Sequence, residues 1–296
     1  MKKLKINGLS KTYPNGTHAL QDVNLEIKQG MFGLLGPNGA GKSTLMRTIA
    51  TLQSSDSGNI EFDGVDIARN ESEIKKKLGF LPQSFGFYPN LSAWDTLNYF
   101  AILKGITNNS ERKNLVTEWL VKVNLFDYRK KRVGGFSGGM KQRLGIAQAL
   151  IANPELVIVD EPTAGLDPKE RNHFHNILAE IGEDKIVILS THIVDDVSDL
   201  CTDMAIIDYG KVILQGSPLT EIEKLKDKMW KKVIKKDELA WYNSEFEVIS
   251  SHLFMGDLRI FVYSEFELHG FERKEPNLED VYFKTIPHQG AKVGRS

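Results

Sequence analysis

Apolar and polar residues alternate in some segments of the chain and form continuous apolar runs in others. Residues 4–9 and 20–27 alternate, which is typical of half-exposed antiparallel strands. Residues 31–35 and 156–159 are short apolar runs, as expected of strands inside a sheet. The pattern therefore predicts an α/β protein. Further strands are predicted at residues 58–62, 77–81, 185–190, 203–209 and 212–215, the last two as a hairpin turning at Gly210-Lys211.

Helical spacing of apolar residues predicts three helical regions. Residues 43–52 follow a glycine-rich loop, and residues 140–152 follow Ser137, which is well placed as an N-cap. Residues 92–123 carry apolar faces and predict a helical insert. Helical spacing alone explains the aromatic side chains of this insert, so we assign them to the core rather than to a ligand site.

The character of the chain changes after Gly216-Ser217-Pro218. Residues 220–238 are rich in lysine, which indicates either a solvated face balanced by nearby acids or attraction to an anionic membrane surface. Short strands are expected at residues 246–249 and 258–263. We predict a main domain over residues 1–216, with a helical subdomain at about 90–152, a small accessory α+β domain over 217–287, and a disordered tail over 288–296.

Composition and charge exclude several classes of protein. The chain has 296 residues, a formal net charge of −1 and a pI near 6.7, so nothing in its overall charge favours nucleic acid as a partner. Cys201 is the only cysteine, which predicts a buried structural thiol and suits a reducing compartment. No run approaches the roughly 18 to 20 apolar residues that span a bilayer, so a membrane role requires a partner.

Residues 36–44 (G-P-N-G-A-G-K-S-T) can bind a nucleotide triphosphate largely through the backbone. Glycines let the loop curl, so that its N–H groups and the positive end of the following helix meet one anion. Lys42 would reach the β- and γ-phosphates, and Ser43 would place a hydroxyl on Mg²⁺. A glycine-rich turn before a helix is the alternative, but the order strand, loop, helix favours the phosphate site. The candidate loop residues are Gly36, Pro37, Asn38, Gly39, Ala40, Gly41, Lys42, Ser43 and Thr44.

Polar side chains follow two of the predicted strands. Asp160 and Glu161 end the apolar run at residues 156–159, where α/β sheets bind ligands and where unpartnered carboxylates are costly. Asp160 suits Mg²⁺ through water, and Glu161 suits a general base for an attacking water. His192 follows residues 185–190 and is either a surface histidine or a third member of this site. The phosphate loop and the carboxylates favour the site.

Other segments have both a structural and a functional interpretation. Tyr13 either stacks on a purine base or covers an edge of the sheet. Residues 134–139 (G-G-F-S-G-G) are a flexible linker with a cap or a second anion-binding helix start. Residues 85–90 (F-G-F-Y-P-N) carry aromatic side chains in a turn-rich segment, which indicates a contact surface.

Taken in this order, these residues resemble the ATP-binding subunit of ATP-binding cassette (ABC) transporters over residues 4–215. The resemblance implies a P-loop NTPase fold with a mixed sheet core, an antiparallel β subdomain and a helical insert, and it implies ATP and Mg²⁺ as ligands. For nucleotide binding it identifies Tyr13 as the adenine-stacking aromatic, residues 36–44 as Walker A and residues 156–160 as Walker B. For hydrolysis it identifies Gln83 as the catalytic and Mg²⁺-binding loop glutamine, Glu161 as the catalytic glutamate and His192 as the switch histidine. It also identifies Ser137, Gly138 and Gly139 as the signature, and residues 164–167 with Asp167 as the D-loop.

One motif departs from the family pattern. The usual L-S-G-G-Q is F-S-G-G-M here, which removes a polar side chain near the γ-phosphate but keeps Ser137 and both glycines. The resemblance implies two chains arranged head to tail, with ATP between the Walker A motif of one and the signature of the other. Two separate anion-binding helix starts agree with this, because a single triphosphate needs only one. We expect a homodimer that drives a membrane partner and binds no nucleic acid.

Two further segments resemble a subgroup of the family. Residues 85–105 and 276–283 are similar to the ATPases of multidrug and antibiotic exporters of the ABC-2 class, in which the permease is a separate chain. We therefore expect an exporter ATPase at the cytoplasmic side of the membrane. An importer ATPase is the alternative. A soluble ABC ATPase is a second alternative. Such proteins are expected to have tandem cassettes, a long coiled coil or zinc-binding cysteines, and this sequence shows none of these features.

Overall fold

The computed structural model describes residues 2–163 and 166–286, and its contacts divide the chain into the units 1–212 and 213–296. The division falls inside the strand β10 (Lys211–Gly216), close to the end of the main domain predicted at residue 216. Among the described helices, none combines the length and the apolar character needed to cross a bilayer.

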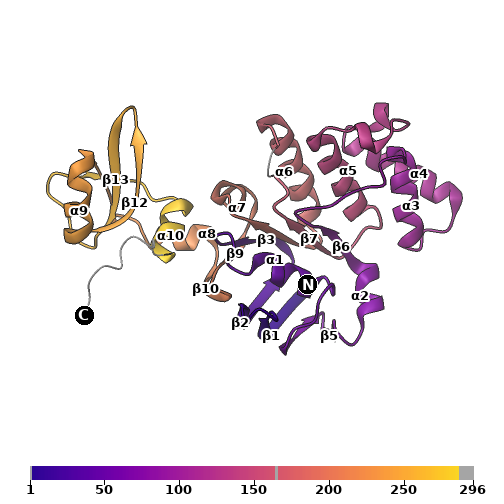
Figure 1. Ribbon diagram of the computed structural model, residues 1–296, viewed down its shortest axis with the longest axis horizontal. Coiled ribbons are helices and arrows are strands. Elements are labelled where there is room, and N and C mark those ends of the chain that lie inside the picture. The colour runs from indigo at the N-terminus through magenta and orange to yellow at the C-terminus, as the bar shows by residue number, and fades with distance from the viewer. Residues whose placement is uncertain (1, 164–165, 287–296) are drawn as a thin grey trace. The chain divides into compact units, whose positions relative to one another are not determined.

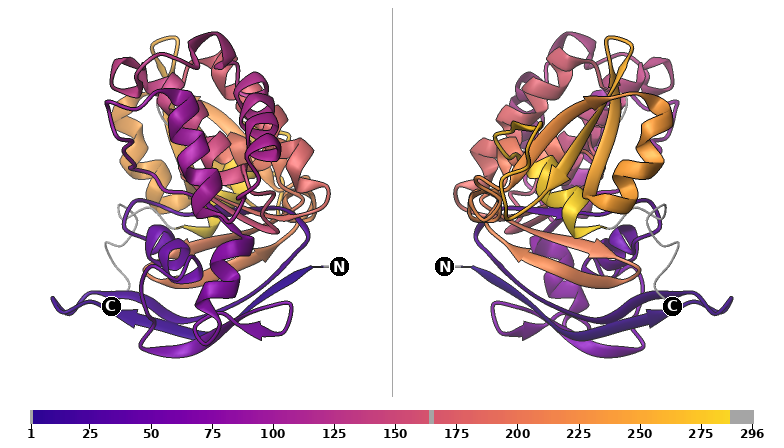
Figure 2. Two further views of the ribbon diagram at one scale, coloured as in Figure 1. Left: turned by 90° about the vertical axis from the view of Figure 1, so that its right-hand side faces the viewer. Right: turned by 90° about the vertical axis from the view of Figure 1, so that its left-hand side faces the viewer.

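An antiparallel sheet begins the first unit. It contains β1 (Lys3–Thr12), β2 (His18–Lys28), β4 (Ser57–Phe62) and β5 (Val65–Asp66) in the order β2-β1-β4-β5. Ile6 pairs with Leu25 on one side and Ile60 on the other, so the alternating apolar residues share one buried face. The indigo strands form a layer away from the magenta helices (Figure 2). The expected half-exposed strands are confirmed.

A second sheet forms the centre of the first unit (Figure 1). Its order is β10-β9-β3-β8-β7-β6, and the pairs β3–β8, β3–β9, β7–β8 and β6–β7 are parallel. Every residue of β7 and β8 is buried, as the apolar run at 156–159 predicts. The strands not yet bounded are β3 (Gly30–Leu35), β6 (Leu78–Leu81), β7 (Leu156–Asp160), β8 (Ile186–Thr191) and β9 (Asp203–Asp208).

The turn between β9 and β10 differs from the prediction by one residue. It lies at Tyr209-Gly210, and Lys211 already belongs to β10. Tyr209 and Gly210 have φ values of 44° and 75°. Positive φ at both central residues is what a type I′ hairpin turn requires, because its twist matches that of the strands it joins.

Helices α1 (Lys42–Ile49), α2 (Glu71–Lys77), α6 (Pro168–Gly182) and α7 (Val194–Leu200) accompany the sheets. Helix α1 contacts β2 of the antiparallel sheet and also β7 and β8 of the central sheet, and it shares one apolar core with both. The phosphate loop, which precedes α1, is therefore anchored to a core that both sheets share. Cys201 is buried here as expected, and burial raises the pKa of its thiol.

The predicted helical insert consists of α3 (Ala93–Leu103) and α4 (Asn109–Lys122), followed by short 3₁₀ turns (Phe126–Tyr128 and Val133–Gly135) and by α5 (Gly138–Leu150). Ser137 is the N-cap of α5, because its Oγ accepts a hydrogen bond from the N–H of Met140 at 3.2 Å. Ser92 and Asn108 cap α3 and α4 in the same way. The predicted cap is confirmed.

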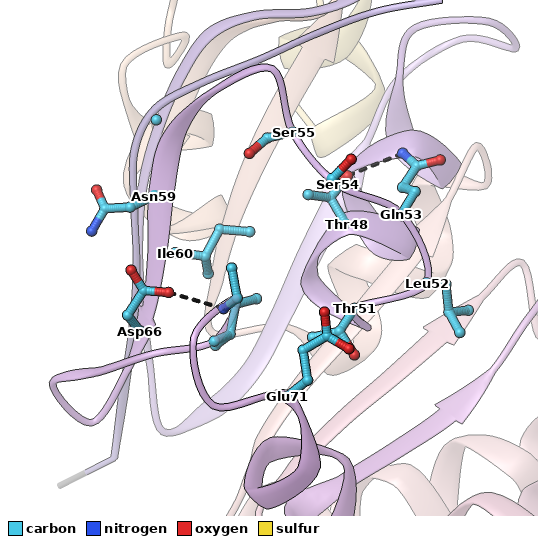
Figure 3. A pocket seen from close by; sticks show the side chains of 13 residues that line it. Thr48, Thr51, Leu52, Gln53, Ser54, Ser55, Asn59, Ile60, Asp66 and Glu71 are labelled. Carbon is cyan, nitrogen blue, oxygen red and sulfur yellow. Dashed lines mark hydrogen bonds between the residues drawn. The ribbon is translucent and has the colours of Figure 1, made fainter.

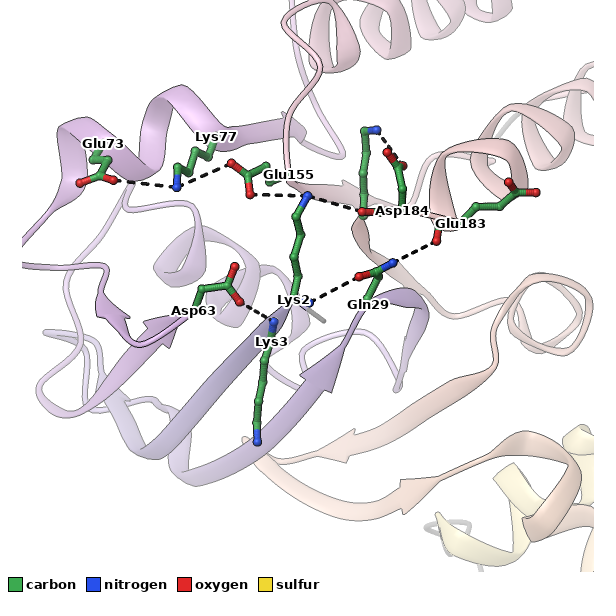
Figure 4. A network of polar contacts seen from close by, with 10 residues as sticks. Lys2, Lys3, Gln29, Asp63, Glu73, Lys77, Glu155, Glu183 and Asp184 are labelled. Atoms are coloured by element: carbon green, nitrogen blue, oxygen red, sulfur yellow. Dashed lines mark hydrogen bonds and ion pairs between the residues drawn. The ribbon is translucent and has the colours of Figure 1, made fainter.

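A polar network ties the antiparallel sheet to the central one (Figure 4). Lys2 Nζ lies 3.5 Å from Glu155 Oε2 and donates to the carbonyl oxygen of Asp184 at 3.5 Å. Gln29 Nε2 donates to the carbonyl oxygen of Glu183 at 3.1 Å. Glu155 and Asp184 precede β7 and β8, so these contacts lie at the opposite ends of the strands from Asp160 and Glu161. Partly exposed pairs of this kind contribute about 0 to 1 kcal/mol each, so they set the orientation of β1 more than its stability.

The second unit is a small α+β domain. Its sheet has the order β12-β13-β11-β14, and Trp230, Tyr242 and Ile260 belong to its apolar core. Its elements are α8 (Pro218–Glu223), β11 (Met229–Ile234), a 3₁₀ turn (Lys236–Glu238), α9 (Leu239–Glu245), β12 (Glu247–Phe254), β13 (Asp257–Tyr263), β14 (Glu272–Arg273) and α10 (Leu278–Thr285).

Strand β11 was not expected, because it lies inside the lysine-rich segment at residues 220–238. Its lysines interrupt the apolar pattern, but Lys231 lies 3.3 Å from Glu272 and Lys232 lies over the rings of Tyr242 and Phe271. The Lys231–Glu272 pair fits the expectation of lysines balanced by nearby acids, whereas Lys232 is placed on aromatic rings. The predicted tail at 288–296 lies outside the described residues.

Candidate functional site

A pocket of about 440 Å³ lies at the loop between β3 and α1. This volume falls within the usual range for small-molecule sites of about 300 to 1,000 Å³. The loop predicted to bind phosphate, the tyrosine predicted to stack on a base, the predicted loop glutamine and one of the predicted carboxylates all line it. The lining residues are Tyr13, Thr17, Ala19, Asn38, Gly39, Gly41, Lys42, Ser43, Thr44, Gln83 and Glu161.

Glycine is required at two positions of the loop. A Cβ on Gly36 would stand 2.3 Å from the carbonyl oxygen of Ile207, and one on Gly41 would stand 2.4 Å from that of Ala19. Gly41 also has a φ of 107°, which residues with side chains rarely adopt. Gly41 is the N-cap of α1 and has no side chain to satisfy the first N–H groups of the helix. These donors and the positive end of the helix are therefore available to an anion.

Lys42 is held inside the loop. Its Nζ donates to the carbonyl oxygens of Gly36 and Pro37 at 2.7 and 3.1 Å, and the residue is only 5% exposed. Burial lowers the pKa of the Lys42 amine, and the negative charges of Glu161 and Asp160 oppose part of that shift. A buried ammonium group of this kind gains from an additional anionic partner.

Asp160 ends β7 as a buried carboxylate, 3% exposed. Its Oδ1 atom has no hydrogen-bond partner among the residues that the structure describes. An unsatisfied buried carboxylate oxygen is costly unless a cation meets it. Ser43 lines the neighbouring pocket, so the donor set fits Mg²⁺, which binds through one or two protein oxygens, water and substrate phosphates. A dedicated cluster of acids is not needed, and the described residues contain none.

Glu161 has two side-chain partners from the neighbouring strands. Its Oε1 lies 3.0 Å from His192 Nδ1, its Oε2 accepts from Gln83 Nε2 at 3.2 Å, and Lys42 Nζ is 3.9 Å from Oε1. Gln83, Glu161 and His192 follow β6, β7 and β8, which are adjacent and parallel. The structure thus brings together three residues that the sequence predicted separately.

The backbone of Glu161 has a φ of 50°, which is uncommon for a residue with a side chain. Its N–H donates to the carbonyl oxygen of Ser190 at 2.8 Å and so holds this conformation. Backbone strain of this kind costs on the order of 1 to 3 kcal/mol and is concentrated at functional sites. This turn fixes the direction in which the Glu161 carboxylate leaves the end of β7.

Tyr13 is placed beside the phosphate loop. Its hydroxyl oxygen lies 3.2 Å from Thr44 Oγ1 and donates to Gln53 Oε1 at 3.3 Å. The ring lines the pocket together with Asn38 and Gly39. This position is compatible with the predicted stacking of Tyr13 on a base.

The predicted signature residues lie apart from this pocket. None of Ser137, Gly138 and Gly139 is among its lining residues. A Cβ on Gly138 would meet nothing within 4 Å, whereas one on Gly139 would stand 2.1 Å from Oε2 of Glu170. Asp167 caps α6 by accepting from the N–H of Glu170 at 2.8 Å, and residues 164 and 165 of the predicted D-loop lie outside the described residues. The two helix starts that the sequence predicted to bind anions, at α1 and α5, are thus separate from one another.

A second pocket, of about 320 Å³, lies between the end of α1 and the strands β4 and β5 (Figure 3). Its charged lining residues are Asp66 and Glu71. Asp66 Oδ1 already accepts from the N–H of Ala68 at 2.9 Å. Carboxylates repel a triphosphate, so this pocket is not a rival to the one that contains Lys42.

Sequence reasoning missed a buried polar cluster next to the site. Asp196 of α7 is its centre, with Thr163, Arg171, His175 and Thr191 around it. Asp196 stands in a helix with acids on both sides, where a solvated charge is the ordinary expectation. Only its burial distinguishes it, and no sequence pattern reports that burial.

Comparison with known proteins gives consistent matches. The family model described as ABC transporter matches residues 20–164. The linearmycin resistance ATP-binding protein LnrL of Bacillus subtilis is 39% identical over 216 residues, which are 72% of this chain and 69% of LnrL. The bacitracin transport ATP-binding protein BcrA of Bacillus licheniformis is 34% identical and matches 96% of this chain and 97% of its own.

Solved structures agree with the sequence matches. A dimeric ATP-binding cassette, MJ0796, in a post-hydrolysis state bound to ADP and Pi is similar with a TM-score of 0.67 and 28% identity, covering 72% of this chain and 98% of the other. The structure of an ATP-binding subunit of an ABC transporter has a TM-score of 0.68, with 75% of this chain and 92% of the other covered. The chain therefore belongs to the ABC transporter family, as an ATP-binding and ATP-hydrolysing subunit.

Proposed function

We propose that this chain drives an exporter as a homodimer that binds two Mg·ATP between its protomers and acts on a permease encoded as a separate chain. The hydrolysis step of the proposal rests on the set of contacts of Glu161, which lies within reach of Gln83, His192 and Lys42 at the edge of the nucleotide pocket. A carboxylate in this position can accept a proton from water that attacks the γ-phosphate.

Each neighbouring residue has a role in this proposal. The loop N–H groups and Lys42 hold the β- and γ-phosphates, and Tyr13 stacks on the adenine. Ser43, Asp160 and Gln83 would hold Mg²⁺, which would neutralise charge on the phosphates when bound. Glu161 accepts the proton of the attacking water. His192 keeps the Glu161 carboxylate in place and faces the charge that develops on the γ-phosphate.

Dimerisation completes the site. ABC ATPase domains dimerise, and the helix start at Ser137 is separate from the pocket that contains Lys42. Ser137, Gly138 and Gly139 of one protomer would approach the γ-phosphate held by the other, and Asp167 would lie close to that interface. Head-to-tail pairing with two-fold symmetry creates two equivalent sites.

The aromatic segment after Gln83 is proposed as part of the permease contact. Phe85 packs so closely on α5 that a Cβ on Gly145 would stand 2.7 Å from its ring, so Phe85 anchors the segment to α5. Tyr88 is 67% exposed and packs edge-on against Tyr99. Tyr99 is itself 42% exposed, so its assignment to the core from helical spacing is wrong, because that spacing does not show which face of the helix other segments cover. Exposed paired aromatics of this kind are common anchors of protein interfaces.

Export is favoured over import by the relatives, since LnrL is named for linearmycin resistance and YbhF of Escherichia coli is described as a probable multidrug ATP-binding protein.

Affinity purification of the tagged chain from detergent-solubilised membranes tests the proposal. A co-purifying permease without a periplasmic binding protein is expected. Recovery of a binding protein would indicate an importer, and the absence of any membrane protein would indicate a non-transport ATPase.

A further inference from the structure

Asp196 is a buried carboxylate in α7 that the proposed hydrolysis does not use directly. It is 0% exposed. Its Oδ1 accepts from Arg171 Nε at 2.8 Å, and His175 Nε2 lies 2.8 Å from the same oxygen. Its Oδ2 accepts from Thr163 Oγ1 at 2.6 Å and Thr191 Oγ1 at 3.3 Å. All four partners lie outside α7, between 5 and 33 positions from Asp196, so the carboxylate joins several segments of the chain.

The two hydroxyl partners stand next to the proposed catalytic residues. Thr163 follows Glu161 by two positions, and Thr191 directly precedes His192. Thr191 Oγ1 also accepts from the N–H of Ile193 at 2.9 Å, so its hydroxyl spans the backbone on both sides of His192. Oδ2 of Asp196 thus holds the segment that carries Glu161 and the segment that carries His192.

The other oxygen fixes the carboxylate itself. Arg171 and His175 lie on α6, which follows the Thr163 segment in the chain. A buried carboxylate with donors on both oxygens is rigid, because rotation would leave it unsatisfied in a medium of low polarity. Helix α6 therefore sets the position of Asp196, and Asp196 transmits that position to Thr163 and Thr191.

We propose that Asp196, through Thr163 and Thr191, is a positioning residue that sets the 3.0 Å separation of Glu161 and His192. The inference rests on the proposed function, in which Glu161 and His192 act on the γ-phosphate. A misplacement of about 1 Å at a reacting group can lower turnover by up to about 100-fold. Loss of either hydroxyl contact should thus reduce turnover without touching the phosphate loop.

Thr163→Val and Thr191→Val test this, because valine keeps the branched shape and removes the hydroxyl. Thr163→Ser and Thr191→Ser are the matched controls that keep the hydroxyl. We expect each valine variant to lower kcat by about tenfold or more, while KM for ATP and the affinity for a fluorescent ATP analogue change by less than about twofold. The serine variants should retain most of the wild-type kcat.

A double variant distinguishes a positioning role from a purely structural one, because a purely structural effect would not depend on the presence of His192. If Thr191 acts through His192, Thr191→Val should lower kcat much less in a His192→Ala background than in the wild-type chain. Additive effects would overturn the inference. So would a wild-type kcat in both valine variants, an equal loss of nucleotide affinity, or a failure of both to fold.

The inference and the proposed function fail in different ways. If Glu161→Gln retains turnover, the proposed function is wrong and the inference falls with it. If Glu161→Gln loses turnover while both valine variants keep the wild-type kcat, the proposed function stands and only the positioning role is wrong.

Discussion

His192 Nδ1 lies 3.0 Å from Oε1 of Glu161, although the two residues are 31 positions apart. The contact exists because β7 and β8 are neighbouring parallel strands in which Asp160 is paired with Ser190. Both side chains therefore leave the sheet at the same edge, beside the phosphate loop that follows β3. Four predictions test this arrangement and its surroundings.

Replacing Glu161 by glutamine should lower ATP turnover by about 10² to 10⁴-fold, because the amide cannot accept the proton of the attacking water. ATP affinity should persist, since Lys42 and the loop remain. The variant should accumulate as an ATP-bound dimer, because a charge that opposes closure on ATP is also removed. Phosphate release and size-exclusion chromatography with ATP and Mg²⁺ measure both effects.

Glu155→Gln is the matched control, since Glu155 precedes the same strand at its other end and pairs with Lys2 and Lys77 near the surface. It should hydrolyse ATP at the wild-type rate. Wild-type turnover in Glu161→Gln would instead show that another group accepts the proton.

Mixing a Lys42→Ala chain with a Gly138→Asp chain should restore hydrolysis that neither has alone. In a mixed dimer both defects fall at one site, and the other site has an intact loop and an intact signature. With half of the dimers mixed and independent sites, activity should reach up to about a quarter of wild-type. Steady-state ATPase assays after subunit exchange measure the recovery.

Gly138 suits this test because a Cβ there meets nothing within 4 Å, whereas one on Gly139 would clash with Glu170. Gly138→Ala is the control for shape, and it should retain more activity than Gly138→Asp because it adds no charge facing the γ-phosphate. Mixed dimers that neither form with ATP nor hydrolyse it would count against the shared site.

Tyr88→Ser combined with Tyr99→Ser should weaken co-purification of the permease and leave the ATPase activity of the isolated chain unchanged. The reason is that both rings are exposed and lie away from the nucleotide pocket. Phe87→Ser is a poorer probe, because Phe87 packs on Phe85 and Phe100 and its loss would disturb local packing.

Phe266→Ser is the control for the loss of an exposed aromatic, since Phe266 is 81% exposed in the second unit. It should not alter permease recovery. Equal recovery with the tyrosine variant would mean that the permease binds elsewhere on the chain.

ATP affinity should fall at alkaline pH, beginning below the ordinary lysine pKa of about 10.4, because burial lowers the pKa of Lys42 and phosphate binding requires its charged form. Without nucleotide, the effect of rising pH on the free energy of unfolding has the opposite sign to its effect on ATP affinity. The unfolded chain holds the Lys42 proton to higher pH than the folded chain does, so this group's contribution to the free energy of unfolding rises with pH between the two pKa values.

Lys42→Met should abolish the alkaline loss of affinity together with most of the affinity itself. Its free energy of unfolding without nucleotide, measured by urea denaturation against pH, should be no lower than that of the wild-type chain near neutral pH. A clearly less stable variant would mean that the hydrogen bonds from Nζ to Gly36 and Pro37 outweigh the cost of burying the amine.

Local features of the sequence were sufficient to predict the phosphate loop, the cap at Ser137 and most strands. The loop depends on glycines whose required backbone conformation is local, and the cap depends on a side chain three residues from its donor. Strand β11 was missed because two lysines interrupt its apolar pattern. In the structure Lys231 pairs with Glu272 and Lys232 lies over the ring of Phe271, and a local pattern does not show such contacts with other elements.

The amino-acid sequence by itself determined which residues could bind phosphate, metal and water, because their chemistry and their place after apolar runs are properties of the chain. Only the tertiary structure decided that Gln83, Glu161 and His192 meet, since strand order and register place them at one edge. It also decided that Asp196 is buried among donors rather than solvated. Burial depends on what other segments of the chain pack around a residue, and no local spacing contains that information.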